Sequence, residues 1–209
     1  MSRFEPSPDP APDSSAAPAA IVRPKSYTAP SASRVRHLVA AALVTAFMAA
    51  TGWVALPVGP VPVTLQVFGV VLAALLLSWE WAAVALAIYL VLGSAGVPVF
   101  ALGTAGLGVV LGPTGGYVIG FALAAPAGAW VRQMLERRGI KQVIADACSA
   151  VLVIAVIYLI GWFQLAAVTN MGLLKAFAFG VVPFVVPDAA KAAVAIAVAS
   201  AVRGSGVRL

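Results

Sequence analysis

The sequence contains few charged residues and almost no cysteine or histidine. Charged residues are 10% of the 209 residues, against about 25% in ordinary soluble domains, and hydrophobic residues are 62%. The single cysteine, Cys148, cannot form an intrachain disulfide or a cysteine-based metal cluster. The single histidine, His37, excludes the usual multi-histidine zinc site. This composition predicts a polytopic membrane protein with no metal site.

The sequence also lacks the residue patterns of membrane enzymes and of nucleotide-binding proteins. Its 7 acidic residues are spread too thinly to supply a carboxylate cluster for Mg²⁺, or a nucleophile with its base. GPTGGY, residues 112–117, lacks the lysine of a phosphate-binding GxxxxGK[ST] loop and is followed by an apolar run. We therefore expect no catalytic residue, no bound cofactor and no ATP site in this chain.

Basic residues outnumber acidic ones, 13 to 7, for a formal net charge of +6. They lie at the ends of apolar runs, which is typical of membrane topology signals rather than of a nucleic-acid surface. We therefore expect membrane lipid, and not nucleic acid, as a partner.

Long uncharged runs follow a different N-terminal segment. Residues 1–36 are rich in Pro and small polar residues, a composition that cannot bury enough apolar surface to fold. A membrane-crossing helix needs about 20 apolar residues, or somewhat fewer where loops enter the membrane. We predict a disordered cytoplasmic tail at 1–36 and an all-α membrane domain at 37–209. Its six transmembrane helices are expected near 38–56, 66–78, 82–97, 114–131, 142–167 and 187–202.

The basic residues predict the orientation of these spans. Clusters at 34–36, 132–141 and 203–208 fall on one side of the membrane if there are six spans. The positive-inside rule makes that side cytoplasmic, together with both termini. We expect a multi-pass protein of the bacterial cytoplasmic membrane. One charge in this pattern, Asp146, is expected to be an interfacial residue on the cytoplasmic side.

Three segments rich in Pro and Gly then lie together on the outer face. They are residues 57–66, 93–117 and 181–191, and their prolines and glycines disfavour a continuous helix. Non-helical backbone at membrane depth is tolerated only where it is buried in protein or lines a cavity. The three segments therefore predict an outward-facing ligand cavity.

Asp188 and Lys191 are the most informative charges near this cavity. They lie three residues apart at the start of the last span, on one helix face, and Pro187 is compatible with the first helical turn. Ionisable groups at membrane depth usually mark a substrate or ion path. The alternative is an interfacial pair in which the two charges neutralise each other.

Other polar residues are weaker candidates. Gln66 and Thr64, at the entry to the second span, could line the cavity or satisfy the loop backbone. Thr104 and Tyr117 could also line it. In the first span Ala42, Ala46 and Ala50 recur every four residues, so that another helix can approach this face closely. The face serves either packing within the protein or docking of a membrane partner.

Several of these segments together resemble one family. VPVTLQ (61–66), GSAGVPVF (93–100), GLGVVLGPTGGY (106–117) and PDAAK (187–191) are similar to BioY, the biotin-binding S component of energy-coupling factor (ECF) transporters. The resemblance extends from about residue 36 to the end of the chain.

The resemblance implies a fold, a ligand and partners. It implies a six-helix S component that binds biotin from outside with high affinity. The family's Asp-x-x-Lys ligand pair corresponds to Asp188 and Lys191, and its alanine docking motif to Ala42, Ala46 and Ala50. Thr104 is the candidate for the polar ligand that the family often carries in the loop that corresponds to residues 93–117. The partners implied are a transmembrane coupling protein and two cytoplasmic ATPase subunits, which use ATP.

Alternative functions belong to other classes. The protein could be a self-sufficient membrane transporter, which an internal repeat would favour, or an S component for another vitamin. An integral membrane enzyme acting on a lipid is the remaining alternative.

Overall fold

The computed structural model describes residues 32–205. The tail predicted for residues 1–36 lies outside the described residues up to position 31, and the first helix begins at Ala32, before the predicted domain boundary. The long helices are α1 (Ala32–Trp53), α2 (Gln66–Leu76), α3 (Trp79–Ser94), α5 (Gly115–Arg137), α6 (Gln142–Thr169) and α8 (Val185–Gly204). The short elements are β1 (Ala55–Leu56), β2 (Val63–Thr64), η1 (Ala101–Gly103), α4 (Leu107–Val110), α7 (Leu173–Gly180) and η2 (Val182–Phe184).

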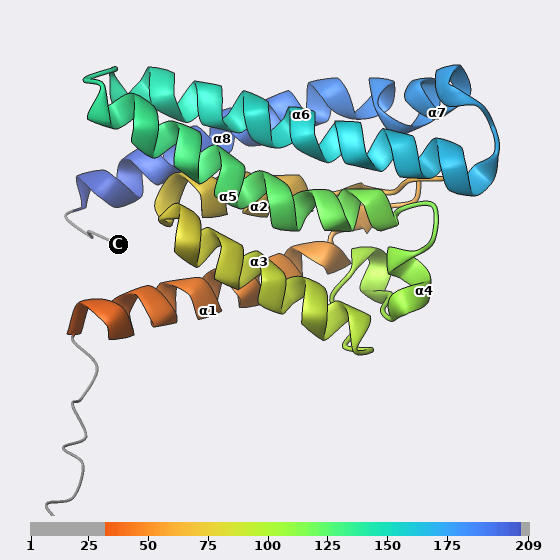
Figure 1. Ribbon diagram of the computed structural model, residues 1–209, viewed down its shortest axis with the longest axis horizontal. Coiled ribbons are helices and arrows are strands. Elements are labelled where there is room, and N and C mark those ends of the chain that lie inside the picture. The colour runs from red at the N-terminus through yellow and green to blue at the C-terminus, as the bar shows by residue number, and fades with distance from the viewer. Residues whose placement is uncertain (1–31, 206–209) are drawn as a thin grey trace, which may run out of the picture. The chain divides into compact units, whose positions relative to one another are not determined.

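The described part of the chain is the predicted helical bundle (Figure 1). Each of the six predicted spans overlaps a helix, and Gly115, in the Gly-rich segment 93–117, is the first residue of α5. Helix α5 extends beyond the predicted end at Val131 to Arg137. Hydropathy predicts only the apolar part of a helix, and a helix can continue past it where charged residues occupy the last turns.

Four helical segments are long and apolar enough to cross a membrane. They are 34–53, 115–137, 142–169 and 173–204, the last of which includes α7, η2 and α8. Helices α2 and α3 are apolar but shorter, with 11 and 16 residues. At a rise of about 1.5 Å per residue, α2 is roughly half as long as the 30 Å hydrocarbon layer.

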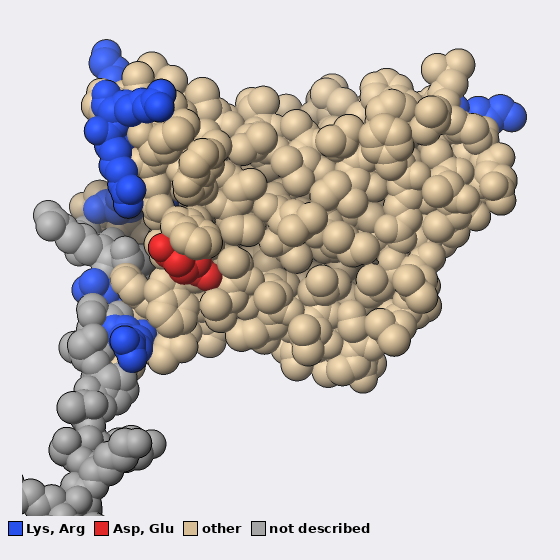
Figure 2. Space-filling model, viewed as in Figure 1, with Lys and Arg blue, Asp and Glu red and all other residues tan. Residues whose placement is uncertain are grey.

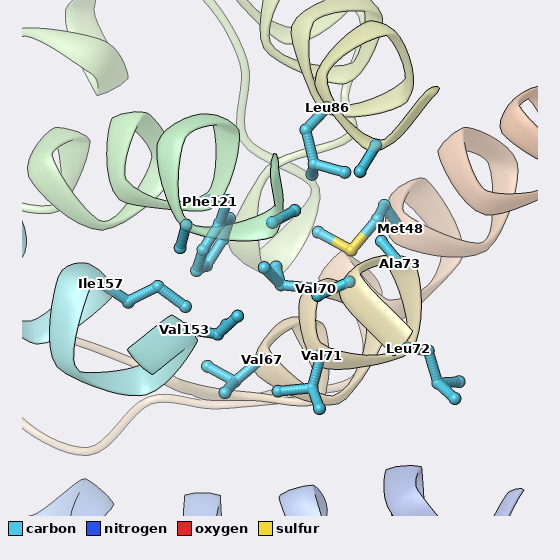
Figure 3. Packing of buried hydrophobic residues seen from close by; sticks show 14 of the residues in the cluster. Met48, Val67, Val70, Val71, Leu72, Ala73, Leu86, Phe121, Val153 and Ile157 are labelled. Atoms are coloured by element: carbon cyan, nitrogen blue, oxygen red, sulfur yellow. The ribbon is translucent and has the colours of Figure 1, made fainter. Parts of the chain in front are cut away.

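Helix α2 lies at the centre of the bundle, in contact with α1, α5, α6 and α8. Its residues Val70, Val71 and Ala73 have no exposed surface. Figure 3 shows Val67 and Val70 beside Phe121 of α5 and the α6 residues Val153 and Ile157, with Met48 and Leu86 on the other side. A helix that is apolar on all faces needs this kind of environment.

Large apolar side chains cover the outer surface of the bundle. Leu43, Val151 and Val186 are 65%, 68% and 78% exposed. A soluble protein rarely presents so continuous an apolar surface, whereas a membrane protein presents it to lipid.

The three segments rich in Pro and Gly meet at one end of the bundle, and the basic residues gather at the other. In Figure 1 the β1 and β2 strands, α4 and the α6–α7 connection lie at the right. Strands β1 and β2 form a short antiparallel ladder that pairs Ala55 with Thr64. Figure 2 shows Lys and Arg concentrated at the left, where α5 ends and α6 begins.

Candidate ligand-binding site

A pocket lies at the end of the bundle where the three Pro- and Gly-rich segments meet. It encloses about 570 Å³ of space not occupied by protein atoms, its open mouth included. Most of its wall is apolar: Val61, Pro62, Val67, Ala101, Val109, Val118, Phe121, Ile157 and Phe184. The polar part of the wall is Thr64, Gln66, Thr104, Thr114, Tyr117, Tyr158 and Asp188. The pocket thus combines an apolar wall with a few polar groups, as small-molecule sites generally do.

Asp188 is the charged residue among those that line the pocket. It lies in the first turn of α8, where the positive end of the helix dipole favours an anion. Only 1% of its surface is exposed. Its Oδ1 accepts a hydrogen bond of 2.7 Å from Lys191 Nζ, and its Oδ2 accepts one of 2.8 Å from the Tyr158 hydroxyl. A carboxylate oxygen has two lone pairs, so Asp188 keeps acceptor capacity for a ligand donor.

Lys191 lies behind Asp188 rather than on the pocket wall. Its Nζ donates to Asp188 Oδ1 and to the backbone carbonyl of Thr64, both at 2.7 Å. The ammonium has three N–H donors, and within residues 32–205 these two contacts are its hydrogen bonds. Its side chain is 16% exposed. The predicted pair therefore forms, and it ties α8 to the end of β2.

Tyr158 is the polar residue that the sequence analysis missed. It lies on α6, inside the apolar run VLVIAVIYLIGW, and is separated from Asp188 by 30 residues. Its hydroxyl is a hydrogen-bond donor in the middle of an apolar helix, and a buried carboxylate needs such a donor. That pattern is the signal that could have identified it.

Gln66 is 2% exposed and lies at the start of α2. Its side-chain amide donates to the Tyr89 hydroxyl, which in turn donates to the carbonyl of Val99 at 3.1 Å. Gln66 thus lines the pocket and, through Tyr89, also links α2 to α3 and to the segment 93–117. Of the two alternatives considered for Gln66, it lines the pocket, whereas its side-chain amide contacts a side-chain hydroxyl and not the loop backbone.

Thr64, Thr104 and Tyr117 all line the pocket, with their strongest polar contacts to the backbone. Thr104 donates its hydroxyl to the carbonyl of Ala101 at 2.8 Å, and Tyr117 donates to that of Gly180 at 2.7 Å. The Thr64 hydroxyl accepts a 3.3 Å hydrogen bond from the Gln66 backbone N–H. Five of the six predicted ligand residues therefore lie on one pocket wall, and Lys191 lies directly behind it.

The glycines of GPTGGY allow close packing beside the pocket. Gly115 and Gly116 begin α5. A Cβ on Gly116 would lie 2.5 Å from the carbonyl oxygen of Ile160 on α6. Gln164 Nε2 donates to the carbonyls of Val110 and Gly112, at 2.8 and 3.0 Å. The stretch is thus a tightly held wall element between α4 and α6.

The alanine face of α1 is exposed. Ala42, Ala46 and Ala50 are all solvent-accessible, whereas Ala41, Thr45 and Met48 on the opposite side are buried. Among the described residues, the face therefore does not serve packing within the protein. A smooth exposed surface of small residues is what a second membrane helix can approach closely.

At the opposite end of the bundle Asp146 is buried in the protein. It is 1% exposed and forms an ion pair with Arg203 of α8. Arg203 also donates to the carbonyl of Leu75, at 3.1 Å. Because α2 ends early, its last carbonyls lie inside the protein and need donors. Asp146 forms an ion pair with the Arg203 guanidinium, which donates to one of these carbonyls.

Arg132 serves the same helix end from α5. It is 8% exposed and donates to the carbonyls of Ala74 and Leu77 at 3.1 and 3.0 Å. It also forms an ion pair with Glu136 at 3.0 Å. Arg132 and Arg203 therefore cap the C-terminal end of the short helix α2, which is the end away from the pocket.

The chain is similar to biotin transporters along most of its length. It is 40% identical over 166 residues to the "Probable biotin transporter BioY" of Pyrococcus horikoshii, with coverage of 78% of this chain and 95% of the relative. It is also 40% identical over 166 residues to the "Biotin transporter BioY" of Thermotoga maritima, with coverage of 79% and 94%.

The fold is also known from a crystal structure. The S-component for biotin from an ECF-type ABC transporter superposes with a TM-score of 0.78 at 24% identity, covering 85% of this chain and 95% of the other. The BioY family matches residues 24–206, which include every helix described here. The resemblance noted in the sequence is therefore confirmed, and the chain belongs to the BioY family.

Proposed function

We propose that this protein is the biotin-binding S component of an ECF-type transporter and mediates biotin uptake across the bacterial cytoplasmic membrane. The observation that carries the proposal is the Asp188–Lys191 pair at a mostly apolar pocket, in a chain of the BioY family. Biotin offers ureido N–H donors, a carbonyl oxygen, an apolar thioether ring and an anionic tail. The pocket presents groups that complement each of the first three.

Asp188 and Lys191 have different roles in this proposal. The free lone pairs of the Asp188 carboxylate accept the ligand N–H groups, while Tyr158 and Lys191 hold the carboxylate in place. Lys191, which lies behind the carboxylate and not on the pocket wall, acts on the ligand through Asp188. Ionisable side chains at membrane depth are costly, and those that occur there usually belong to a substrate or ion path. The position of Asp188 and Lys191 therefore supports a role in ligand binding.

The remaining polar residues position the ligand and the loops. Gln66 and Thr104 supply polar groups to the pocket wall. Thr64 joins the first loop to Lys191 through its carbonyl. The ring of Tyr117 forms part of the wall, with its hydroxyl fixed to Gly180.

We propose that transport uses partners, because the chain shares the fold of the S-component for biotin from an ECF-type ABC transporter. We infer that Ala42, Ala46 and Ala50 dock onto the transmembrane coupling protein, which rests on two cytoplasmic ATPase subunits. Their exposure on α1 supports this inference. The chain is then a binding and translocating subunit, without bound cofactor and not an enzyme.

The membrane orientation is part of the proposal. Six crossings are formed by α1, α2, α3, α5, α6 and α8, with the flanking segments completing the two short ones. The basic end of the bundle faces the cytoplasm, together with both termini, and the pocket opens outward. Cysteine labelling from outside at Lys175→Cys, but not at Arg138→Cys, would support this orientation.

Equilibrium binding of labelled biotin to the detergent-purified protein tests the function. We expect saturable binding that an excess of unlabelled biotin displaces and that other vitamins do not. Binding of another vitamin instead would support the alternative S component. Uptake by proteoliposomes without ECF partners would support a self-sufficient transporter.

A further inference from the structure

A second groove lies at the basic end of the bundle, far from the pocket. It is formed by the start of α3 and the end of α5, and is lined by Trp79, Trp130, Gln133, Met134, Arg137 and Arg138. The two indoles are 44% and 54% exposed. Neither the ligand pocket nor the alanine face of α1 includes any of these residues.

The two arginines of the groove carry unneutralised charge. Arg137 and Arg138 are exposed, and the ion pairs of the described residues involve Arg132, Lys191 and Arg203 instead. The nearest carboxylate in sequence, Glu136, is already paired with Arg132 at 3.0 Å. Glu80 follows Trp79 on α3 but does not line the groove. The groove therefore has a net positive charge.

The position of the groove defines the kind of ligand. Trp79 begins α3, and Arg137 ends α5, one of the helices long enough to cross the membrane. Both residues therefore lie near the level of the lipid headgroups, where tryptophan is enriched. Guanidinium groups bind phosphate oxygens through paired N–H donors. Indole rings beside them present an apolar surface to the glycerol and the first methylenes of an acyl chain.

We propose that this groove binds the phosphate headgroup of an anionic phospholipid from the leaflet at the basic end of the bundle. Arg137 and Arg138 bind the phosphate, Gln133 offers an amide donor, and Trp79 and Trp130 flank the upper part of the lipid chains. The bound lipid fills the groove between α3 and α5.

The test is lipid binding measured by native mass spectrometry of the detergent-purified protein. Phosphatidylglycerol and phosphatidylcholine with matched acyl chains are titrated separately. One phosphatidylglycerol should bind at a concentration about tenfold or more below that of phosphatidylcholine, since each Arg near the surface contributes about a fivefold preference. Equal binding of the two lipids would overturn the proposal.

Two pairs of Arg→Gln variants distinguish lipid binding in this groove from a general attraction of lipid to basic surface residues. Arg137→Gln/Arg138→Gln should abolish the preference, whereas Arg34→Gln/Arg36→Gln, which removes the same charge from α1 at the same end, should retain it. Loss of the preference in both variants, or in neither, would contradict a specific groove. Inorganic phosphate in excess should not displace the lipid, and displacement would show a site for free phosphate instead. The altered arginines are exposed, and thermal unfolding of each variant verifies that it is folded.

Discussion

Tyr158 of α6 donates a 2.8 Å hydrogen bond to Asp188 Oδ2 of α8, and so fixes the carboxylate that faces the pocket. Lys191 holds the other oxygen from behind, at 2.7 Å. The carboxylate is therefore held by two side chains from two helices. A group positioned in this way loses little entropy when a ligand binds to it.

Removal of the phenol hydroxyl should weaken ligand binding without unfolding the protein. Tyr158→Phe keeps the ring and its packing but deprives Asp188 of one donor. A hydrogen bond to a charged group contributes about 1.5–3 kcal/mol, so biotin affinity should fall by roughly tenfold or more. Equilibrium binding of labelled biotin measures this effect. The matched control is Tyr117→Phe, which removes the hydroxyl that donates to the Gly180 carbonyl but leaves the contacts of Asp188 unchanged. The loss of biotin affinity should be larger in Tyr158→Phe than in Tyr117→Phe.

A bulky residue on the alanine face should separate transport from binding. Ala46→Leu enlarges an exposed position on α1. Biotin binding by the isolated protein should be unchanged, while assembly with the coupling protein and cellular biotin uptake should be lost. Ala155→Leu, an equally exposed alanine of α6, is the control and should preserve uptake. Normal uptake by the Ala46 variant would contradict docking through this face.

The close approach of α6 to Tyr117 should make the protein sensitive to substitution of Gly161. A Cβ on Gly161 would lie 2.5 Å from the Tyr117 ring, whereas one on Gly108 would meet nothing within 4 Å. Overpacking of a close contact costs about 1–3 kcal/mol. Gly161→Ala should therefore lower the thermal unfolding temperature by several degrees and weaken biotin binding. Gly108→Ala should leave the unfolding temperature nearly unchanged, and similar losses in both variants would refute the packing argument.

The buried ion pair at the other end should show strong coupling. Asp146→Leu removes the carboxylate from the Arg203 guanidinium, whose side chain is 23% exposed, and should destabilise the protein by less than the roughly 3–5 kcal/mol that breaking a fully buried pair costs. The double variant Asp146→Leu/Arg203→Met replaces the pair by apolar groups and should recover part of that loss. A double-mutant cycle on thermal unfolding measures the coupling. Additive effects of the two single changes would show that the pair contributes nothing as a pair.

Short-range patterns predicted the helices and most of the polar residues that line the pocket, and long-range contacts explain the rest. Asp188 and Lys191 share a helix face because they are three residues apart, so their contact follows from local geometry. Tyr158 reaches Asp188 only through the packing of α6 against α8, which no spacing in the sequence encodes. The helix α7 was missed because its 8 residues lie in a segment treated as a loop.

The charges at the basic end show the same limit. The charge pattern placed Arg132, Asp146 and Arg203 near the ends of the apolar runs, but it gave no reason to expect that Arg132 and Asp146 are buried. That reason is the early end of α2, whose free carbonyls attract two guanidinium groups. Helix length depends on tertiary contacts, and the sequence analysis placed the end of α2 at residue 78 rather than at Leu76.

The most direct test of the account is equilibrium binding of labelled biotin to the purified wild-type protein and to the Asp188→Asn and Lys191→Ala variants. We predict saturable binding of biotin by the wild type at micromolar concentration or below, and an affinity at least about tenfold lower in each variant, a loss of about 1.4 kcal/mol or more. Lys175→Ala, on the exposed outer helix α7, serves as the charge control and should bind like the wild type. Absence of biotin binding at micromolar concentration, or unchanged affinity in both pocket variants, would contradict the account.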